Sequence, residues 1–188
     1  MEWVGRSRAG IEMRFDPADA EVLRGLVIGV RDLVGGVGTA ADPLERLLGG
    51  NLRRHPVGGS VRDDGDRPAG MEDPALARLL PDGYLDDDEA AKEFRELTED
   101  SLRAHKSETA QRVLDSLPAG GGEVCLDQDT TRAWLSALND VRLVIGTRLN
   151  VTEETDYPDP ADPAAPGYEL YRWLTLVQEL LVEATIGE

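Results

Sequence analysis

The stretch AWLSALNDVRLVIGTRL, residues 133–149, decides how this chain folds. Apolar residues recur in it at helical spacing, which predicts a helix with one buried face. These apolar residues are Leu135, Leu138, Ile145 and Leu149. The position that would complete their stripe is occupied by Arg142. Because an unpaired guanidinium in apolar surroundings is costly, we expect Arg142 to lie in a buried or half-buried polar cluster.

Partners for Arg142 are expected from its own helix and from a second helix near the end of the chain. Asn139 lies one turn before it, and Gln178 and Glu179 belong to an amphipathic segment, residues 168–185. An acidic residue elsewhere in the chain is the alternative to Gln178 and Glu179. Such a cluster can fix the register of two packed helices, or it can be a ligand or partner site. The first interpretation is favoured, and the second stays open.

Two more residues of the quoted stretch bear on its neighbours. Gly146 lets a neighbouring helix approach closely, at a cost of roughly 1 kcal/mol in helix propensity relative to alanine. Arg148 falls on a different face of the helix, where we expect solvent or an interface.

The surrounding sequence predicts a mainly α fold, a single helical domain over residues 1–188 with a small two-stranded β element. Residues 11–15 and 123–126 are the expected strands, paired with each other. The helix after the first strand should begin at Asp16-Pro17 and end at Gly35-Gly36. The further predicted helices are 42–48, 74–81, about 86–117, one beginning near 127–131, and 168–185.

Two connections and one buried face complete this expectation. Residues 51–73 should be a flexible or disordered loop, because apolar periodicity is almost absent there. Residues 151–167 should be an acidic, proline-rich connection. The helix near 86–117 should bury Phe94 and Leu97 at its start, and Val113, Leu114 and Leu117 at its end.

Composition limits the classes of partner. The chain has 20 Lys and Arg against 37 Asp and Glu, a net charge of −17, so direct DNA binding is not expected. An apolar run of the ~18 residues needed to span a bilayer is missing, as is a secretory signal. We therefore expect a cytoplasmic protein with no membrane contact.

The residues that usually carry catalysis lack their usual spacing. His55 and His105 do not belong to a metal-ligand pattern, so no metal is expected. Gly120 to Gly122 is not followed by the residues of a phosphate-binding loop, and no nucleophile elbow is present. We expect no catalytic residue and no cofactor, and therefore not an enzyme.

Cys125 is the redox candidate, and it is the single cysteine of the sequence. In a strand it would point away from the face shared by Val124 and Leu126. An inert thiol is the favoured interpretation, and oxidation could join only two separate chains through this residue.

Four segments carry a resemblance to a known family. They are DPALARLLPDGYLDDDEAAKEFRELTEDSLRAHK (73–106), GGGEVCLD (120–127), the opening stretch with its string N-D-x-R-L-x-x-G-T-R-L, and YRWLTLVQELLV (171–182). They resemble the AosR-like family of actinobacteria, the actinomycete oxidative stress regulators, formerly described as a domain of unknown function.

The resemblance implies a cytoplasmic regulator tied to oxidative stress and to a cysteine-biosynthesis operon, working with RNA polymerase and an alternative sigma factor. Redox sensing by a cysteine pair does not carry over, because Cys125 has no partner in this sequence. The motif positions are kept as candidates without an assigned reaction: Asn139, Asp140, Arg142, Arg148, Tyr171 and Gln178.

Taken with the charge, these features predict a transcription regulator that acts through protein contacts. Its acidic surface would meet a basic partner such as a sigma factor or a polymerase segment. We also expect a homodimer formed through an aliphatic helix face. The alternative is an adaptor or small-anion-binding module in which the Arg142 cluster receives the anion.

Overall fold

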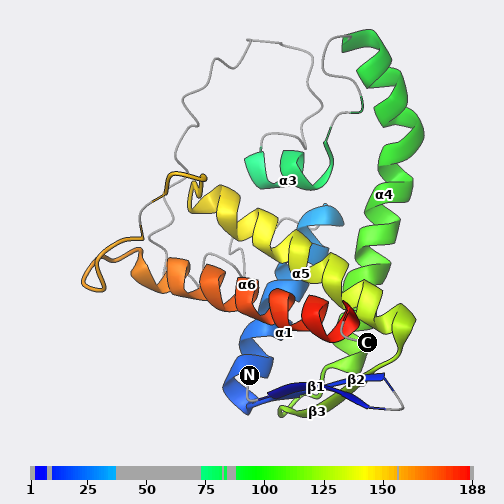
Figure 1. Ribbon diagram of the computed structural model, residues 1–188. Coiled ribbons are helices and arrows are strands. Elements are labelled where there is room, and N and C mark those ends of the chain that lie inside the picture. Colours follow the sequence, from blue (N-terminus) through cyan, green and yellow to red (C-terminus); the bar gives the residue numbers. More distant parts are fainter. Residues whose placement is uncertain are drawn as a thin grey trace.

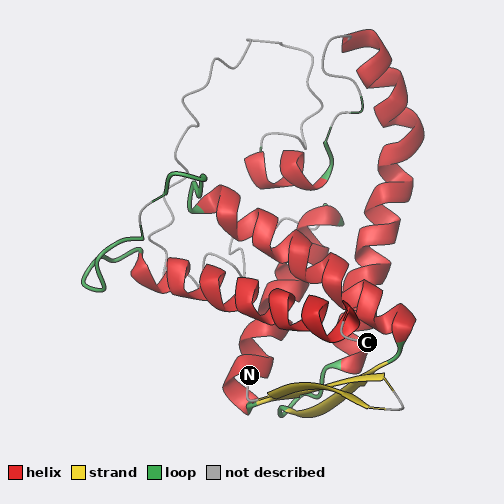
Figure 2. Cartoon of the chain, viewed as in Figure 1, coloured by secondary structure: helices red, strands yellow, loops and turns green. Residues whose placement is uncertain are grey.

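The computed structural model describes residues 3–7, 10–36, 73–81, 83, 88–155 and 157–186. Helices dominate it, and a small antiparallel sheet lies at one end of the helical body (Figures 1 and 2). The mainly α prediction is therefore confirmed. The predicted helix 42–48 and nearly all of the predicted loop 51–73 lie outside the described residues.

The sheet has three strands in the order β1-β2-β3, so the prediction of two strands was incomplete. The strands are β1 (Trp3–Ser7), β2 (Gly10–Phe15) and β3 (Gly122–Leu126). The additional strand is β1, which pairs antiparallel with β2. Its sequence, WVGRS, alternates too little to predict a strand, and pairing with β2 is what extends it.

The predicted pairing of the other two strands is confirmed. Met13 lies opposite Val124 and Ile11 opposite Leu126, and all four side chains are buried. Cys125 alternates with them and is exposed on the other face. One face of the sheet thus joins the helical core, and the other faces solvent.

α1 (Pro17–Val34) begins as its sequence predicts. The Asp16 side chain accepts a hydrogen bond of 2.8 Å from the backbone N–H of Asp19, and the helix ends at Gly35. The face turned to the core consists of Ala20, Leu23, Leu26, Val27, Gly29, Val30 and Val34. Since the cap and the apolar spacing agree, this helix could be predicted almost to the residue.

The central element is α5 (Gln128–Arg148), the helix of the opening stretch. It packs against α1, α3 (Pro74–Leu79), α4 (Asp88–Ser116) and α6 (Ala165–Ile186). Figure 1 shows α6 running below α5 and in front of α1, with α4 rising along one side of the body. Contact with four neighbours explains why α5 is buried on more faces than the predicted stripe.

Trp134 ties α5 to the sheet and to α4. Its ring is fully buried and stacks on Phe15, with 5.7 Å between the ring centroids. Its indole N–H donates a 2.8 Å hydrogen bond to the hydroxyl of Ser116, near the end of α4. This satisfies the one polar group that a buried tryptophan carries.

One predicted boundary needs correction, and another is narrowed to a single residue. α6 begins at Ala165, so the connection predicted over 151–167 is shorter than expected. Pro166 occupies the first turn, where a missing N–H breaks no helical hydrogen bond. At α5, Asp127 is the cap, as one of the predicted starting positions, because its side chain accepts a 2.8 Å hydrogen bond from the N–H of Thr130.

The prediction that Phe94 and Leu97 are buried was wrong. Phe94 is 39% exposed and Leu97 is 76% exposed, whereas Val113, Leu114 and Leu117 at the other end of the helix are buried as predicted. The first half of α4 extends along the outside of the body (Figure 1). Apolar spacing predicts a face, but it does not say whether another element covers that face.

Candidate functional site

The polar residues of the N-D-x-R-L-x-x-G-T-R-L string reach three different neighbours of α5. Asp140 faces α4, Arg142 faces α6, and Arg148 faces the start of α3. These directions follow from the helical period. Arg142 lies two positions after Asp140, and Arg148 lies six positions after Arg142, so the three side chains point to different sides of the helix. The three contacts form the candidate site, and they hold the central helix against its surroundings.

Arg142 lies in a half-buried polar cluster with α6. Its Nη1 donates a 2.6 Å hydrogen bond to Oε1 of Gln178, and its Nε donates a 3.1 Å hydrogen bond to the hydroxyl of Thr175. The guanidinium carbon lies 5.4 Å from the centroid of the Tyr171 ring, a cation–π distance. The structure thus brings Arg142, Tyr171 and Gln178 together.

Two of the expected partners are elsewhere. Asn139 and Glu179 are both exposed, and neither forms a hydrogen bond with Arg142. Asn139 is three positions before Arg142, but the guanidinium turns toward α6 and away from it. Thr175 was missed by the sequence interpretation, although its spacing from Tyr171 and Gln178 places all three on one helix face.

Gly146 has the role predicted for it. A Cβ atom built there would lie 3.2 Å from Cε2 of Tyr171. The missing side chain therefore leaves room for the ring that lies under the guanidinium of Arg142. Gly146 therefore allows both the close approach of α5 to α6 and the cation–π contact between Arg142 and Tyr171.

Asp140 forms a buried ion pair that the sequence interpretation missed. Its carboxylate accepts a 2.7 Å hydrogen bond from Nζ of Lys106 in α4, and the side chains are only 5% and 18% exposed. Burial raises the pKa of Asp140, and the hydrogen bond and charge of Lys106, with a smaller effect of His105, lower that pKa in part. The one sequence signal that could have indicated this pair is the position of Lys106, in the middle of α4, where apolar residues are few.

Arg148 is not on a solvated face, which was one of its two expected positions, and the other, an interface, stays a prediction. Its side chain is 15% exposed, and its Nη2 lies 3.2 Å from Oδ2 of Asp73. Oδ1 of the same aspartate accepts a 2.8 Å hydrogen bond from the N–H of Ala75 and caps α3. One carboxylate therefore both starts α3 and attaches it to the end of α5.

Of these three contacts, only that of Arg142 lacks an opposite charge. Lys106 and Arg148 each pair with a carboxylate, whereas the hydrogen-bond partners of Arg142 are a hydroxyl and an amide. No ion pair joins Arg142 to a carboxylate in the described part of the chain. A half-buried guanidinium with neutral partners keeps the capacity to bind an anion.

Cys125 lies apart from these contacts, on the solvent face of the sheet opposite Glu12. Its redox role stays a prediction. Within the described ranges, no group of three or more His, Cys, Asp or Glu side chains could hold a metal ion. In the same residues, no helix has the length and apolar character needed to cross a bilayer.

Comparison with known proteins identifies relatives of this chain by sequence. The putative oxidative stress regulator AosR of Mycobacterium leprae is 37% identical over 130 residues, 62% of this chain and 60% of that protein. The oxidative stress regulators AosR of Mycobacterium bovis and of Mycobacterium tuberculosis H37Rv are each 36% identical over 129 residues, 61% of this chain and 59% of theirs. This chain thus matches about 60% of the length of these curated relatives.

No solved structure matches the chain. A family model, by contrast, covers more of the sequence than the stretches aligned with these relatives. The model of the family described as Domain of unknown function (DUF2017) matches residues 1–185, which is nearly the whole sequence. This chain therefore belongs to the DUF2017 family.

Proposed function

We propose that this chain regulates the oxidative stress response and cysteine-biosynthesis genes in the cytoplasm, through protein contacts with RNA polymerase or a sigma factor. The observation that carries the proposal is its 36–37% identity to proteins named oxidative stress regulator AosR. The net charge of −17 supports a basic protein partner over duplex DNA, whose phosphates would be repelled. This role requires no catalytic residue.

Within this proposal, the three contacts of α5 have a structural role. Lys106–Asp140, Arg142–Gln178 and Arg148–Asp73 each join α5 to a different helix. They keep the helices at fixed positions, so that exposed residues present a constant surface to a partner. The expected homodimer stays a prediction, and light scattering of the purified chain across a concentration series tests it.

A pull-down experiment tests the proposed partners. The full chain is immobilised and offered RNA polymerase core enzyme, an alternative sigma factor, or both, at low and at raised salt. We expect retention of polymerase or sigma that weakens at raised salt, because charge complementarity is screened. Retention of promoter DNA by the purified chain alone, without retention of either protein, would refute the proposal.

Oxidation of Cys125 is tested separately. The thiol is exposed, so peroxide reaches it and could join two chains in a disulfide. Treated and untreated chains are compared on a non-reducing gel, with Cys125→Ser as the control. A dimer band that Cys125→Ser lacks supports a redox role for Cys125, whereas an unchanged band pattern contradicts a disulfide between chains.

A second candidate function is the binding of a small anion at Arg142. It is favoured by the neutral hydrogen-bond partners of this half-buried guanidinium. A thermal-shift screen of carboxylates, thiols and nucleotides tests it, since a ligand of the folded state raises the midpoint. A shift that Arg142→Met abolishes supports the anion site, and a shift of equal size in the variant contradicts it.

A further inference from the structure

The first half of α4 exposes apolar side chains on adjacent turns. Phe94 is 39% exposed, Leu97 is 76% exposed and Leu102 is 37% exposed. Single exposed leucines are common on protein surfaces, whereas a contiguous apolar patch often marks an interaction site. Around the helix, Leu97 lies ~60° to one side of Phe94 and Leu102 lies ~80° to the other, so the three side chains form an apolar strip centred on Phe94.

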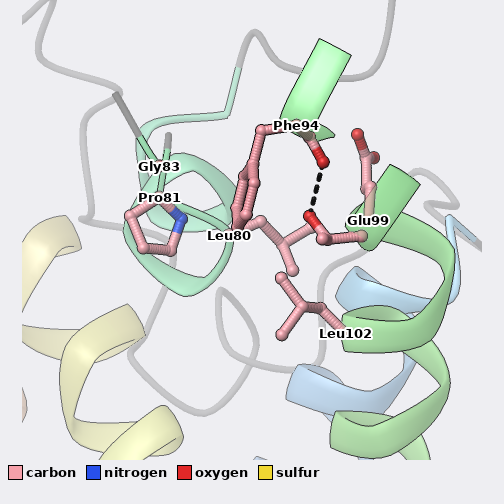
Figure 3. A pocket seen from close by; sticks show the side chains of 7 residues that line it. Leu80, Pro81, Gly83, Phe94, Glu99 and Leu102 are labelled. Atoms are coloured by element: carbon pink, nitrogen blue, oxygen red, sulfur yellow. Dashed lines mark hydrogen bonds between the residues drawn. The ribbon is translucent and has the colours of Figure 1, made fainter. Parts of the chain in front are cut away.

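The strip continues into the segment that follows α3. Leu80, Pro81 and Gly83 face Phe94 and Leu102 across a shallow hollow (Figure 3). The hydroxyl of Thr98, which also lines the hollow, donates a 2.8 Å hydrogen bond to the carbonyl of Phe94. Glu99 also lines the hollow, and its carboxylate pairs with Arg103. Both of these polar groups thus have partners within α4, and the other lining residues are apolar.

Two features define what the hollow can accept. A Cβ atom at Gly83 would lie 2.6 Å from the Phe94 ring, so the glycine allows the ring to lie against the backbone. The open space is about 10 Å³, which is room for about one water molecule. A small-molecule ligand therefore does not fit, and a wider, shallow contact with another protein segment does.

The charge around the strip identifies the chemistry of that segment. The chain carries a net charge of −17, and Glu89 and Asp100 of α4 are exposed. In the same helix, Arg103 pairs with Glu99 at 2.6 Å and donates a hydrogen bond to the carbonyl of Val34. A second copy of this chain would bring the same negative charge to the strip, whereas a basic segment would be attracted.

We propose that the α3–α4 surface, formed by Pro81, Phe94, Leu97 and Leu102, binds an amphipathic segment of a partner protein that is rich in lysine or arginine. Apolar side chains of the segment cover the strip, and its cations face the surrounding carboxylates. The inference rests on the proposed function and identifies the docking surface that this function requires.

A peptide-binding assay tests the surface without a cellular partner. The probe is fluorescein-labelled KLAKLAKKLAKLAK, measured by anisotropy against the full chain at two salt concentrations. Leu97→Asp should weaken binding about tenfold or more, the effect of losing one buried leucine from an interface. Leu176→Asp is the matched control, because Leu176 is also exposed, at 49%, but belongs to α6. Thermal melts confirm that both variants fold.

The added aspartate makes the outcome decisive. If attraction were only electrostatic, the extra negative charge of Leu97→Asp would strengthen binding, so a loss of binding supports apolar contact at the strip. Equal affinity of Leu97→Asp and the unmodified chain would overturn the proposal. Equal weakening of peptide binding by Leu97→Asp and Leu176→Asp would also overturn it. A dimer of the unmodified chain that Leu97→Asp abolishes would overturn it as well, because the surface would then belong to an interface with a second copy.

The pull-down separates this proposal from the proposed function. If the peptide binds the α3–α4 surface but neither polymerase nor sigma is retained, the docking surface is supported and the assigned partner is wrong. If polymerase or sigma is retained equally by the unmodified chain and by Leu97→Asp, the partner is supported and the docking surface is refuted.

Discussion

Replacing Lys106 by methionine should destabilise the protein, because it leaves the buried Asp140 carboxylate without its cation. Removing one partner of a buried ion pair costs roughly 3–5 kcal/mol. Asp140 is 5% exposed, but Lys106 is 18% exposed, so water reaches the site from the lysine side. We therefore expect a loss of about 2–3 kcal/mol in the free energy of unfolding, at or just below the lower limit of that range.

The cost should depend on pH in a defined direction. Burial raises the pKa of Asp140 above its ordinary value of 3.8, so ionisation is opposed in the folded state. The contribution of the Asp140 carboxyl to the free energy of unfolding therefore falls as the pH rises from the ordinary pKa to above the raised pKa. Lys106 lowers the pKa and limits this fall. The cost of Lys106→Met should accordingly grow from acidic to neutral pH, and vanish where the carboxyl is protonated.

Urea denaturation followed by circular dichroism at several pH values measures this cost. Arg112→Met is the control, since its pair with Glu108 on the same helix is 55% and 64% exposed and should contribute less than about 1 kcal/mol. Lys106→Met combined with Asp140→Ala should be more stable than Lys106→Met alone. Equal losses for Lys106→Met and Arg112→Met, or a loss independent of pH, would refute this reasoning.

Three further predictions concern the frame around α5. Gly146→Val should cost about 1–3 kcal/mol of stability, because the added side chain meets the Tyr171 ring, and a thermal melt that matches the unmodified chain would contradict this. Trp134→Phe should lose about 1 kcal/mol or more in urea denaturation, since the 2.8 Å hydrogen bond to Ser116 disappears. Asp127→Ala should destabilise α5 at neutral pH. The hydrogen bond from Thr130 lowers the pKa of Asp127, so this stabilisation is lost as pH falls, and paired pH titrations of stability would show the difference vanishing in acid.

Much of the local structure could be predicted from the sequence. Asp16-Pro17 and Gly35 mark the ends of α1, and the alternation in residues 11–15 and 123–126 identifies two strands and their buried face. These signals are local, because caps and periodicity act within a few residues of the chain. The strand β1 lacks such a signal and forms through its partner β2.

The candidate site could be predicted only in part. An arginine in an apolar stripe indicated a polar cluster, and Gly146 indicated a close helix contact. The contribution of Lys106 and the pairing of Arg148 with Asp73 could not be predicted, since those residues lie 34 and 75 positions from their partners. Choosing among distant partners requires the packing of the whole chain.

By itself, the sequence determined the mainly α class, the strong negative charge and the helical face that carries Arg142. The tertiary structure alone decided which helices Asp140 and Arg148 meet, and it left Phe94 and Leu97 on the surface. The physical reason is that helical periodicity fixes the direction of a side chain relative to its own backbone. What occupies that direction depends on contacts between residues far apart in the chain.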